Sequence, residues 1–443
     1  MMQLLILIIC YLTMLIISIT FSYKKALLSP QIGYCGGFLL QAIYALFWQE
    51  KYDICLSKET FFVLSFGAIT FTLVSWIVQL LCGKLSIKYS STNKNKNKRL
   101  GEPITIDNWK LVGFALFQII VLVLVFRYIL LGASGGFFNA INNFYQTHML
   151  IGTSDNSIPT YIGLMRCICI ASGYFWAYIL CHNIIHGYEG SKKLLLVNVL
   201  LAVLLNIITG SRSGIIEMAI AVFVYVFMVY YFKSARSLYI TPKLIGKILV
   251  LFVIGLFIFH NAAMLLGRTI EVNFSENLAV YLSAEIKNLD IFICSENFGR
   301  GYNIDTNNTL ANIINSFSGS LGLPDVAHKV YSKFNFVNGY NLGNVATTYL
   351  PFVYDGGIGA VIIYTAIMSA IGQILFVSII KKQELIRNID IRIIAYGYMF
   401  FCYTFSFFSN RFYDMIITKY FINTIIVWFG LRFFVEKVNF NRR

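Results

Sequence analysis

The sequence predicts an all-α protein that crosses a membrane many times, because three features of its composition agree. Hydrophobic residues make up 58% of the 443 residues, and the mean hydropathy of +0.71 is far above that of a soluble globular domain. Charged residues are only 12% and stand in short clusters between long apolar runs. Aromatic residues reach 16%, as expected where rings gather at the two surfaces of a bilayer. We therefore expect one polytopic membrane domain over residues 1–443.

About eleven of the apolar runs (ten to twelve) are candidates for transmembrane helices, since a helix needs about 20 apolar residues to cross a bilayer core. The second run is the weakest, because three glycines and Gln41 interrupt it, and the sixth and seventh are short, as in a tightly turned pair. The first run lacks a basic stretch and a small-residue cleavage site, so we expect it to remain as a span. The expected spans are 2–23, 31–48, 60–82, 109–131, 160–181, 194–209, 215–232, 244–266, 357–380, 393–408 and 415–434.

Lysine and arginine give the orientation of these spans. They gather in alternate loops, above all in the polar stretch 91–99 (STNKNKNKR), in 233–243, in 381–392 and at the C-terminus. Because basic residues are retained on the cytoplasmic side, we expect the loop 83–108 and the C-terminus in the cytoplasm. The formal net charge of +15 then reflects topology rather than binding to nucleic acid.

Two loops on the opposite, outer side are long enough to carry function. Residues 132–159 are rich in Gly and Asn, and residues 267–356 form a segment of about 90 residues with mixed character, in which Asn338-Gly339 marks a turn. Within this segment, 278–294 has the spacing of an amphipathic helix and is expected along the membrane surface. Any chemistry is therefore expected on the outer face.

The sequence predicts no cofactor and no metal site. Seven of the nine cysteines lie inside apolar runs, where they act as small apolar residues. Only Cys55 and Cys294 fall in outer loops, where a disulfide between them would be compatible with the sequence. The five histidines lack the spacing of a zinc site, and no nucleotide-binding motif is present.

The most informative feature is a polar stretch between the sixth and seventh runs, 209–214 (TGSRSG). An arginine at membrane depth is costly and by default marks a functional site. Arg212 stands where a helix begins, and the free N–H groups and positive dipole end of a helix favour an anion. Ser211 and Ser213 can cap that helix or donate to the anion. The stretch predicts a phosphate site; the alternative is that Arg212 reaches lipid headgroups or pairs with Glu217, itself a candidate proton acceptor.

Further arginines stand near the outer ends of other runs or in the large outer loop. Singly, such a residue is more often an interfacial anchor. Together with Arg212, however, they would form a basic pocket in a face that is otherwise slightly acidic, which is what capture of a polyanionic lipid headgroup needs. The arginines assigned to this pocket by placement are Arg127, Arg166, Arg268, Arg300 and Arg411.

The end of the large outer loop, 341–357, predicts a wall that binds sugars. Asn344, Tyr354 and Asp355 at a membrane mouth suit hydroxyl-rich ligands, and the alternative is an aromatic belt with an Asp-Gly turn. His328 in the same loop is a candidate general base. Other acidic candidates, which nothing in the sequence ranks, are Glu285, Asp290, Glu296 and Asp305.

On these residues the chain resembles the O-antigen polymerases of bacteria, the Wzy-type polymerases of oligosaccharide repeat units. The resemblance rests on 210–214 (GSRSG), which opens a span after mid-chain. It also rests on the end of a large outer loop, with Asn344, Thr348, Pro351 and 354–357 (YDGG), followed by a Gly-containing span. It covers much of residues 195–380 and the general layout of the whole chain.

The resemblance implies a metal-independent glycosyltransferase on the outer face of the bacterial inner membrane, of use in lipopolysaccharide or other polysaccharide biosynthesis. Such an enzyme transfers a growing glycan from undecaprenyl pyrophosphate to a new lipid-linked repeat unit. Arg212 would contact pyrophosphate, and Tyr354 and Asp355 would help form the sugar-side wall. Its partners would be membrane lipid and a chain-length regulator and flippase of the same pathway. The family often has an even number of spans, from which a count of eleven departs.

The residue chemistry agrees with that reaction. A lipid pyrophosphate is a pre-activated leaving group, arginines stabilise charge on the departing phosphate, and a base removes the proton of the attacking hydroxyl. Glu217, Asp355 and His328 remain alternatives for that base. Rival assignments are an O-antigen ligase, which shares the large outer loop, and a flippase or polysaccharide exporter, which is expected to have short loops.

Overall fold

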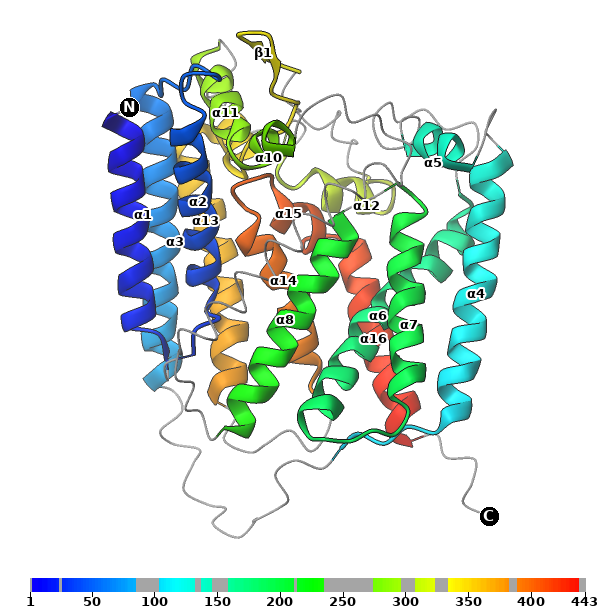
Figure 1. Cartoon of the computed structure of the whole chain (residues 1–443). Coiled ribbons are helices and arrows are strands. Elements are labelled where there is room, and N and C mark those ends of the chain that lie inside the picture. Colours follow the sequence, from blue (N-terminus) through cyan, green and yellow to red (C-terminus); the bar gives the residue numbers. More distant parts are fainter. Residues whose placement is uncertain are drawn as a thin grey trace. The chain divides into compact units, whose positions relative to one another are not determined.

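The chain, in its computed structural model, is built from α-helices and one two-stranded hairpin wherever its residues are described (Figure 1). This arrangement confirms the predicted all-α class. The described residues are 2–23, 26–84, 103–131, 137–145, 158–210, 213–234, 274–295, 307–322, 334–381 and 389–437.

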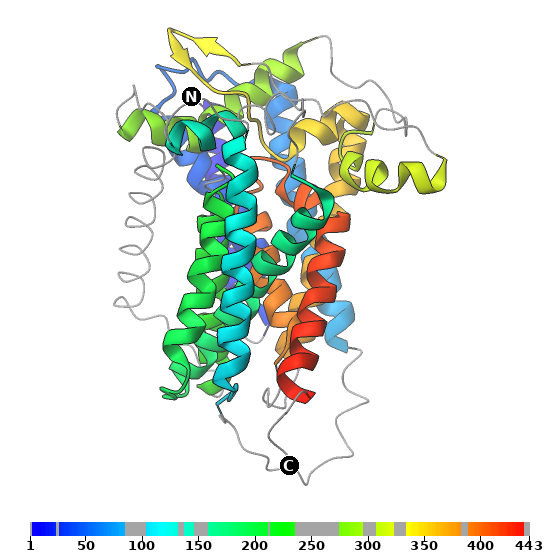
Figure 2. The same cartoon turned by 90° about the vertical axis from the view of Figure 1, so that its right-hand side faces the viewer.

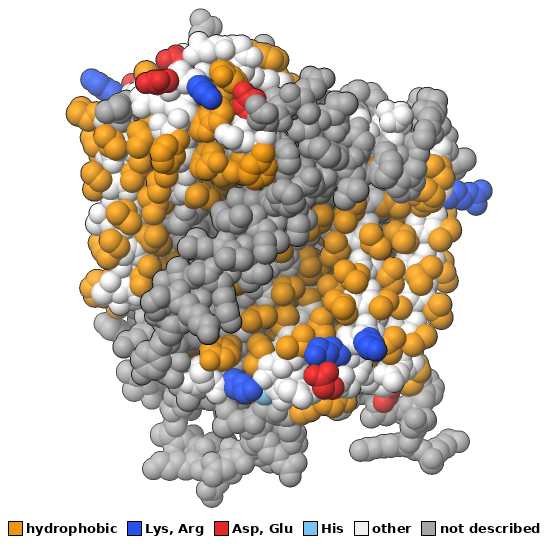
Figure 3. All heavy atoms as spheres, in the orientation of Figure 1, with side chains coloured by type: hydrophobic (Ala, Val, Ile, Leu, Met, Phe, Trp, Pro, Cys, Tyr) orange, Lys and Arg blue, Asp and Glu red, His pale blue; other side chains and the backbone are white. Residues whose placement is uncertain are grey.

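Among the described residues, six helices are long and apolar enough to cross a membrane, so the chain is an all-α membrane protein. On the face drawn in Figure 3, hydrophobic side chains cover the flanks of the long helices, and charged side chains gather near their ends. Ile9, Leu80 and Val123 are each more than half exposed, as expected for side chains that face lipid. The six helices are α1 (Met2–Thr20), α3 (Lys58–Lys84), α4 (Asn108–Leu131), α6 (Thr160–Ile185), α8 (Ser213–Lys233) and α13 (Tyr349–Lys381).

Ten of the eleven expected spans contain a described helix, and the remaining one, 244–266, lies outside the described residues. The count of eleven, its sidedness and the boundaries of the loops stay predictions. Four of these ten helices are α2 (Pro30–Phe47), α7 (Lys192–Ile207), α14 (Ile391–Thr404) and α16 (Lys419–Lys437). The short elements are α5 (Phe137–Tyr145), α10 (Phe274–Leu282), α11 (Ala284–Cys294), α12 (Ala311–Leu321), α15 (Arg411–Met415), β1 (Phe336–Val337) and β2 (Tyr340–Asn341).

The described chain divides into two compact units, each assembled from separate segments. Unit 1 consists of Met1–Asn97, Phe274–Gln383 and Met399–Phe421. Unit 2 consists of Lys98–Asn273, Glu384–Tyr398 and Ile422–Arg443. The prediction of a single membrane domain stays a prediction, and each unit is described by itself.

Unit 1 is held together by aromatic packing among α1, α2, α3 and α13, which lie side by side in Figures 1 and 2. The ring of Tyr34 stacks on Phe71 with centroids 4.0 Å apart, and its hydroxyl is hydrogen-bonded to that of Tyr349. Tyr11 donates to the Leu64 carbonyl at 3.3 Å. The hydroxyls of Tyr11, Tyr34 and Tyr349 are therefore hydrogen-bonded inside the helix packing, as is usual for buried polar groups.

Helix α13 is kinked directly after Asp355. Gly356 and Gly357 leave helical geometry, and Gly357 has φ 61° and ψ −145°, a combination that favours glycine. The sequence predicts a span beginning at residue 357, whereas the helix begins at Tyr349 and continues through the kink. The Asp-Gly pair therefore bends a helix rather than ending a loop.

Unit 2 packs α4, α6, α7 and α8, with polar side chains bonded across the helix contacts. Gln118 Nε2 on α4 donates to the Asn198 carbonyl at 3.1 Å and to Ser172 Oγ at 3.3 Å. Trp428 Nε1 donates to the Ala171 carbonyl at 2.8 Å. Such bonds join apolar helices where the hydrophobic effect gives little drive for association.

The glycines that weaken the second expected span let α2 approach its neighbours in unit 1. A Cβ on Gly37 would lie 2.2 Å from the Thr404 carbonyl oxygen, a main-chain atom that cannot turn away, whereas a Cβ on Gly36 would meet nothing within 4 Å. We expect Gly37→Ala to lower the free energy of unfolding by about 2 kcal/mol, the usual size of an overpacking penalty. Gly36→Ala should be neutral or stabilising because Ala favours helix. Thermal unfolding in detergent compares the two; equal melting temperatures would contradict this packing.

The segment predicted as an amphipathic surface helix is two helices with a break at Ser283. Of these, α11 is buried on nearly every side, with only Cys294 at its end fully exposed. One of its polar residues, Asn288, is bonded inside unit 1, since its Nδ2 donates to the carbonyls of Leu342 at 3.0 Å and Val345 at 2.7 Å. A surface location along the membrane is therefore wrong for α11.

Candidate functional site

The strongest site geometry in unit 2 lies where α6 meets the end of α7. Arg166, half-buried on α6, donates from Nη2 to Thr209 Oγ1 at 2.9 Å and from Nε to the Leu205 carbonyl at 3.3 Å. Thr209 is 1% exposed and donates in turn to the Asn206 carbonyl at 3.0 Å. Because the carbonyl end of a helix carries a partial negative charge, the end of α7 fixes the guanidinium in place.

This contact brings Arg166 to the first residue of the polar stretch 209–214. Gly210 has φ 81°, so the chain turns in the left-handed region that glycine tolerates. A Cβ on Gly214 would lie 2.7 Å from the side chain of Asn206, so the start of α8 and the end of α7 approach closely. The stretch therefore joins two closely packed helix ends beside a fixed arginine.

The structure describes only some of the residues predicted for the basic pocket and the catalytic site. Ser213, half-buried, is the first residue of α8, and Glu217, also half-buried, follows one turn later. Arg127 is exposed on α4. The remaining predicted residues lie outside the described part of the chain: Ser211, Arg212, Arg268, Arg300 and His328.

In unit 1, Asp355 is 3% exposed and its carboxylate is occupied by main chain. Oδ1 accepts the N–H of Asn308 at 2.8 Å, and Oδ2 accepts that of Thr309 at 2.9 Å. A carboxylate that holds two backbone N–H groups acts first as a clamp on that turn. Of its predicted companions, Tyr354 is half-buried with its ring 6.4 Å from Phe292, and Asn344 is half-buried.

Asn307, which sequence reasoning missed, completes this clamp. Its Oδ1 accepts the Leu310 N–H at 2.8 Å, and its Nδ2 donates to the Tyr364 hydroxyl of α13 at 2.7 Å. Asn312 Nδ2 donates to Asp414 Oδ1 at 3.0 Å, which ties α12 to α15. An asparagine whose side chain accepts a main-chain N–H farther along the same turn is a turn signal, but the sequence does not show that the turn is bound to α13.

Arg411 begins the one-turn helix α15 of unit 1. It is half-buried, with the guanidinium carbon 5.6 Å from the Phe408 ring centroid. Its Nε has no hydrogen-bond partner among the described residues. The side chain therefore has a donor available in unit 1, separate from the contact of Arg166 in unit 2.

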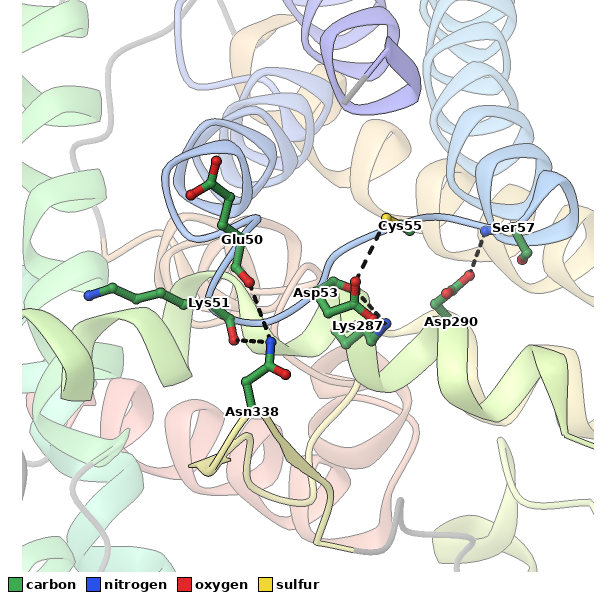
Figure 4. Close-up of polar contacts among 8 residues, drawn as sticks. All are labelled: Glu50, Lys51, Asp53, Cys55, Ser57, Lys287, Asp290 and Asn338. Atoms are coloured by element: carbon green, nitrogen blue, oxygen red, sulfur yellow. Dashed lines mark hydrogen bonds and ion pairs between the residues drawn. The ribbon is translucent and has the colours of Figure 1, made fainter.

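Unit 1 carries a second polar network, drawn in Figure 4, that fixes the turn before α3. Lys287 pairs with Asp53 at 3.4 Å, and Asp290 Oδ1 accepts the N–H of Ser57 at 2.8 Å. Asn338 in the hairpin turn donates to the Lys51 carbonyl at 3.1 Å. The bonds of Lys287 and Asp290 anchor the turn before α3 to α11, and the Asp290 carboxylate acts there as a clamp on main chain. Both outer cysteines, Cys55 and Cys294, are exposed free thiols.

No protein-family model, no curated protein and no solved structure matches this chain. Among the described residues, no group of three or more His, Cys, Asp or Glu side chains is placed to hold a metal ion. The function is therefore inferred from the residues of the chain itself, above all from Arg166 beside the polar stretch 209–214.

Proposed function

We propose that this protein is an O-antigen or related polysaccharide polymerase, a membrane glycosyltransferase that joins undecaprenyl-pyrophosphate-linked oligosaccharide repeat units. The proposal assigns the polar stretch 209–214 and the predicted arginines to binding of pyrophosphate, and the predicted sugar-wall residues of 341–357 to binding of the glycan. It requires an anion site within an apolar protein and a surface that binds hydroxyl-rich ligands.

The observation that carries the proposal is the bond from Arg166 to Thr209 at 2.9 Å. Arg212 follows Thr209 by three residues in the sequence, so the stretch that Arg166 contacts also carries an arginine of its own. Two cations suit a pyrophosphate, which carries more than one negative charge and accepts bidentate bonds from arginine.

In the proposed reaction, the attacking hydroxyl of the new repeat unit forms the glycosidic bond while the bond from sugar to pyrophosphate breaks. Arginines stabilise the charge on the departing pyrophosphate, and this is where most of the rate enhancement is expected. The base that takes the hydroxyl proton is Glu217, His328 or Asp355, and the occupied carboxylate of Asp355 makes it the least suited of the three.

The proposal includes a location and a layout. We place the protein in the bacterial inner membrane as a multi-pass protein of about eleven spans, with the C-terminus and the loop 83–108 in the cytoplasm. The loops 132–159 and 267–356 lie on the outer face, where a flippase would deliver the lipid-linked substrate and a chain-length regulator would act.

The test is the surface polysaccharide ladder of a strain that lacks the gene, with and without the gene restored. Collapse of the ladder to core plus one repeat unit, reversed by the gene, is the expected result. Loss of all capped core with accumulation of lipid-linked polymer would instead identify a ligase. An unchanged ladder would overturn the proposal and favour a transporter or another glycan pathway.

A further inference from the structure

Unit 1 contains a buried carboxyl that the proposed reaction does not use. Glu285, at the start of α11, is 1% exposed. Its Oε2 lies 3.4 Å from Nε2 of Gln41, a long contact, because that Nε2 also donates to the Phe407 carbonyl at 2.9 Å. Its Oε1 has no hydrogen-bond partner among the described residues. The carboxyl is thus buried with one long side-chain hydrogen bond.

Among the described residues, no cation compensates this carboxyl. Lys287 pairs with Asp53, and Asp290 holds the Ser57 N–H. The carboxyls of Glu285 and Glu276 both act electrostatically on the phenol of Tyr52. The other titratable or charged side chains described on elements packed against α11 are Tyr34, Cys35 and Tyr44 on α2, Lys58, Glu59 and Cys82 on α3, Tyr281 on α10, and Tyr349, Tyr354, Asp355, Tyr364 and Lys381 on α13.

The hydrogen-bond donors and acceptors of Glu285 and Gln41 indicate that Glu285 carries a proton. If Glu285 is ionised, it and Gln41 together present two buried acceptors, Oε1 of each, that no described group fills. Leaving buried acceptors unpaired is unfavourable, and leaving a buried charge uncompensated is far more so. One proton on Glu285 removes the charge and turns one of the two acceptors into a donor.

We propose that Glu285 is a neutral carboxylic acid at neutral pH, and that loss of its proton loosens α11 and the outer segments which α11 anchors. Those segments are the turn before α3, bound through Lys287 and Asp290, and the hairpin, bound through Asn288. This pH-dependent loosening of α11 does not depend on the polymerase reaction, so its test is independent of the test of the proposed function.

The direction of the pH dependence follows from burial, which raises the pKa of the Glu285 carboxyl well above its usual range. We call the form with α11 packed in place the closed form, and the form with α11 loosened the opened form. At every pH between the ordinary pKa of glutamate and the raised one, the closed form binds more protons, by up to one, than the opened form. Stability of the closed form is therefore greatest below the ordinary value and falls as pH rises through this window.

Hydrogen exchange of the full-length protein in lipid nanodiscs tests this proposal. Rates for peptides covering 284–294 are measured between about pH 5 and pH 9 and corrected for intrinsic exchange. In the wild type we expect protection to fall up to about tenfold for each pH unit, the effect of one linked proton. In Glu285→Gln, which is neutral at every pH, the decline should vanish and protection at neutral pH should exceed that of the wild type.

Glu59→Gln removes an exposed carboxyl from the first turn of α3 and serves as the matched control, with the slope of the wild type. Infrared spectroscopy adds a readout that needs only folded wild type, namely the carbonyl band of a protonated carboxylic acid at neutral pH. Wild-type protection without a pH slope, or an equal slope in Glu285→Gln, would overturn the proposal. Absence of the protonated-acid band would do the same, even if the variant fails to fold.

Discussion

The Arg212→Ala variant is expected to insert into the membrane and to lose chain extension, by about 100-fold or more, the usual result of removing a group that stabilises charge in a transition state. Arg166→Gln should lose most of the activity as well, because Arg166 is fixed to Thr209 at the same stretch of chain. The measurement is the length of lipid-linked polymer made by membranes that contain equal amounts of each variant.

Arg432→Gln is the matched control for these variants. It removes one positive charge from unit 2, where Arg432 pairs with Glu436 at 3.1 Å on α16, and it should leave polymer length unchanged. Arg166→Lys keeps the charge but loses the two-point hold on Thr209 and Leu205, so its activity should lie between those of Gln and wild type. Polymer of wild-type length from Arg212→Ala would remove the anion site from the proposal.

The helices of this fold could be predicted well because apolar length is a strong signal. Ten described helices overlap expected spans, including α2, where the glycines and Gln41 made the prediction weakest. The structure gives the reason for that weak pattern: Gly37 lies against the Thr404 main chain, and Gln41 donates to the Phe407 carbonyl. A residue that serves close packing looks, in sequence, like an interruption.

The burial of α11 could not be predicted, since its polar residues resemble the wet face of an amphipathic helix. Lys287, Asn288 and Asp290 instead bind segments that are far away in the sequence. The sequence pattern does not show which distant main-chain groups these side chains will bind. The same limit explains Glu285, which the sequence could not separate from three other acidic candidates. Only the count of its partners sets it apart.

The residues of the candidate site could also be predicted only in part from the sequence. Placement near the outer end of an apolar run was enough to select Arg166, but its bond to Thr209 joins residues 43 positions apart and needed the packing of α6 on α7. Asp355 was selected by its motif as a sugar-side or catalytic group. The turn that occupies its carboxylate begins 47 residues earlier, beyond the reach of any local pattern.

The second large effect is expected from substitution of Asp355, whose carboxylate accepts two main-chain N–H groups. Asp355→Ala would leave the N–H groups of Asn308 and Thr309 without their acceptors, at about 1–3 kcal/mol for each buried group. We expect the free energy of unfolding to fall by about 3 kcal/mol and hydrogen exchange to accelerate in peptides covering 307–321. Asp355→Asn keeps one acceptor oxygen, so its loss of protection should be clearly smaller.

The pair of variants also decides whether Asp355 removes the proton of the attacking hydroxyl. A clamp predicts that transfer activity follows protection of 307–321, with Asp355→Asn retaining part of both. A base predicts that Asp355→Asn loses transfer by about 100-fold or more while protection stays near that of the wild type, because an amide cannot accept the proton. Near-normal protection in Asp355→Ala would contradict the clamp, since both N–H groups lose their acceptors in that variant.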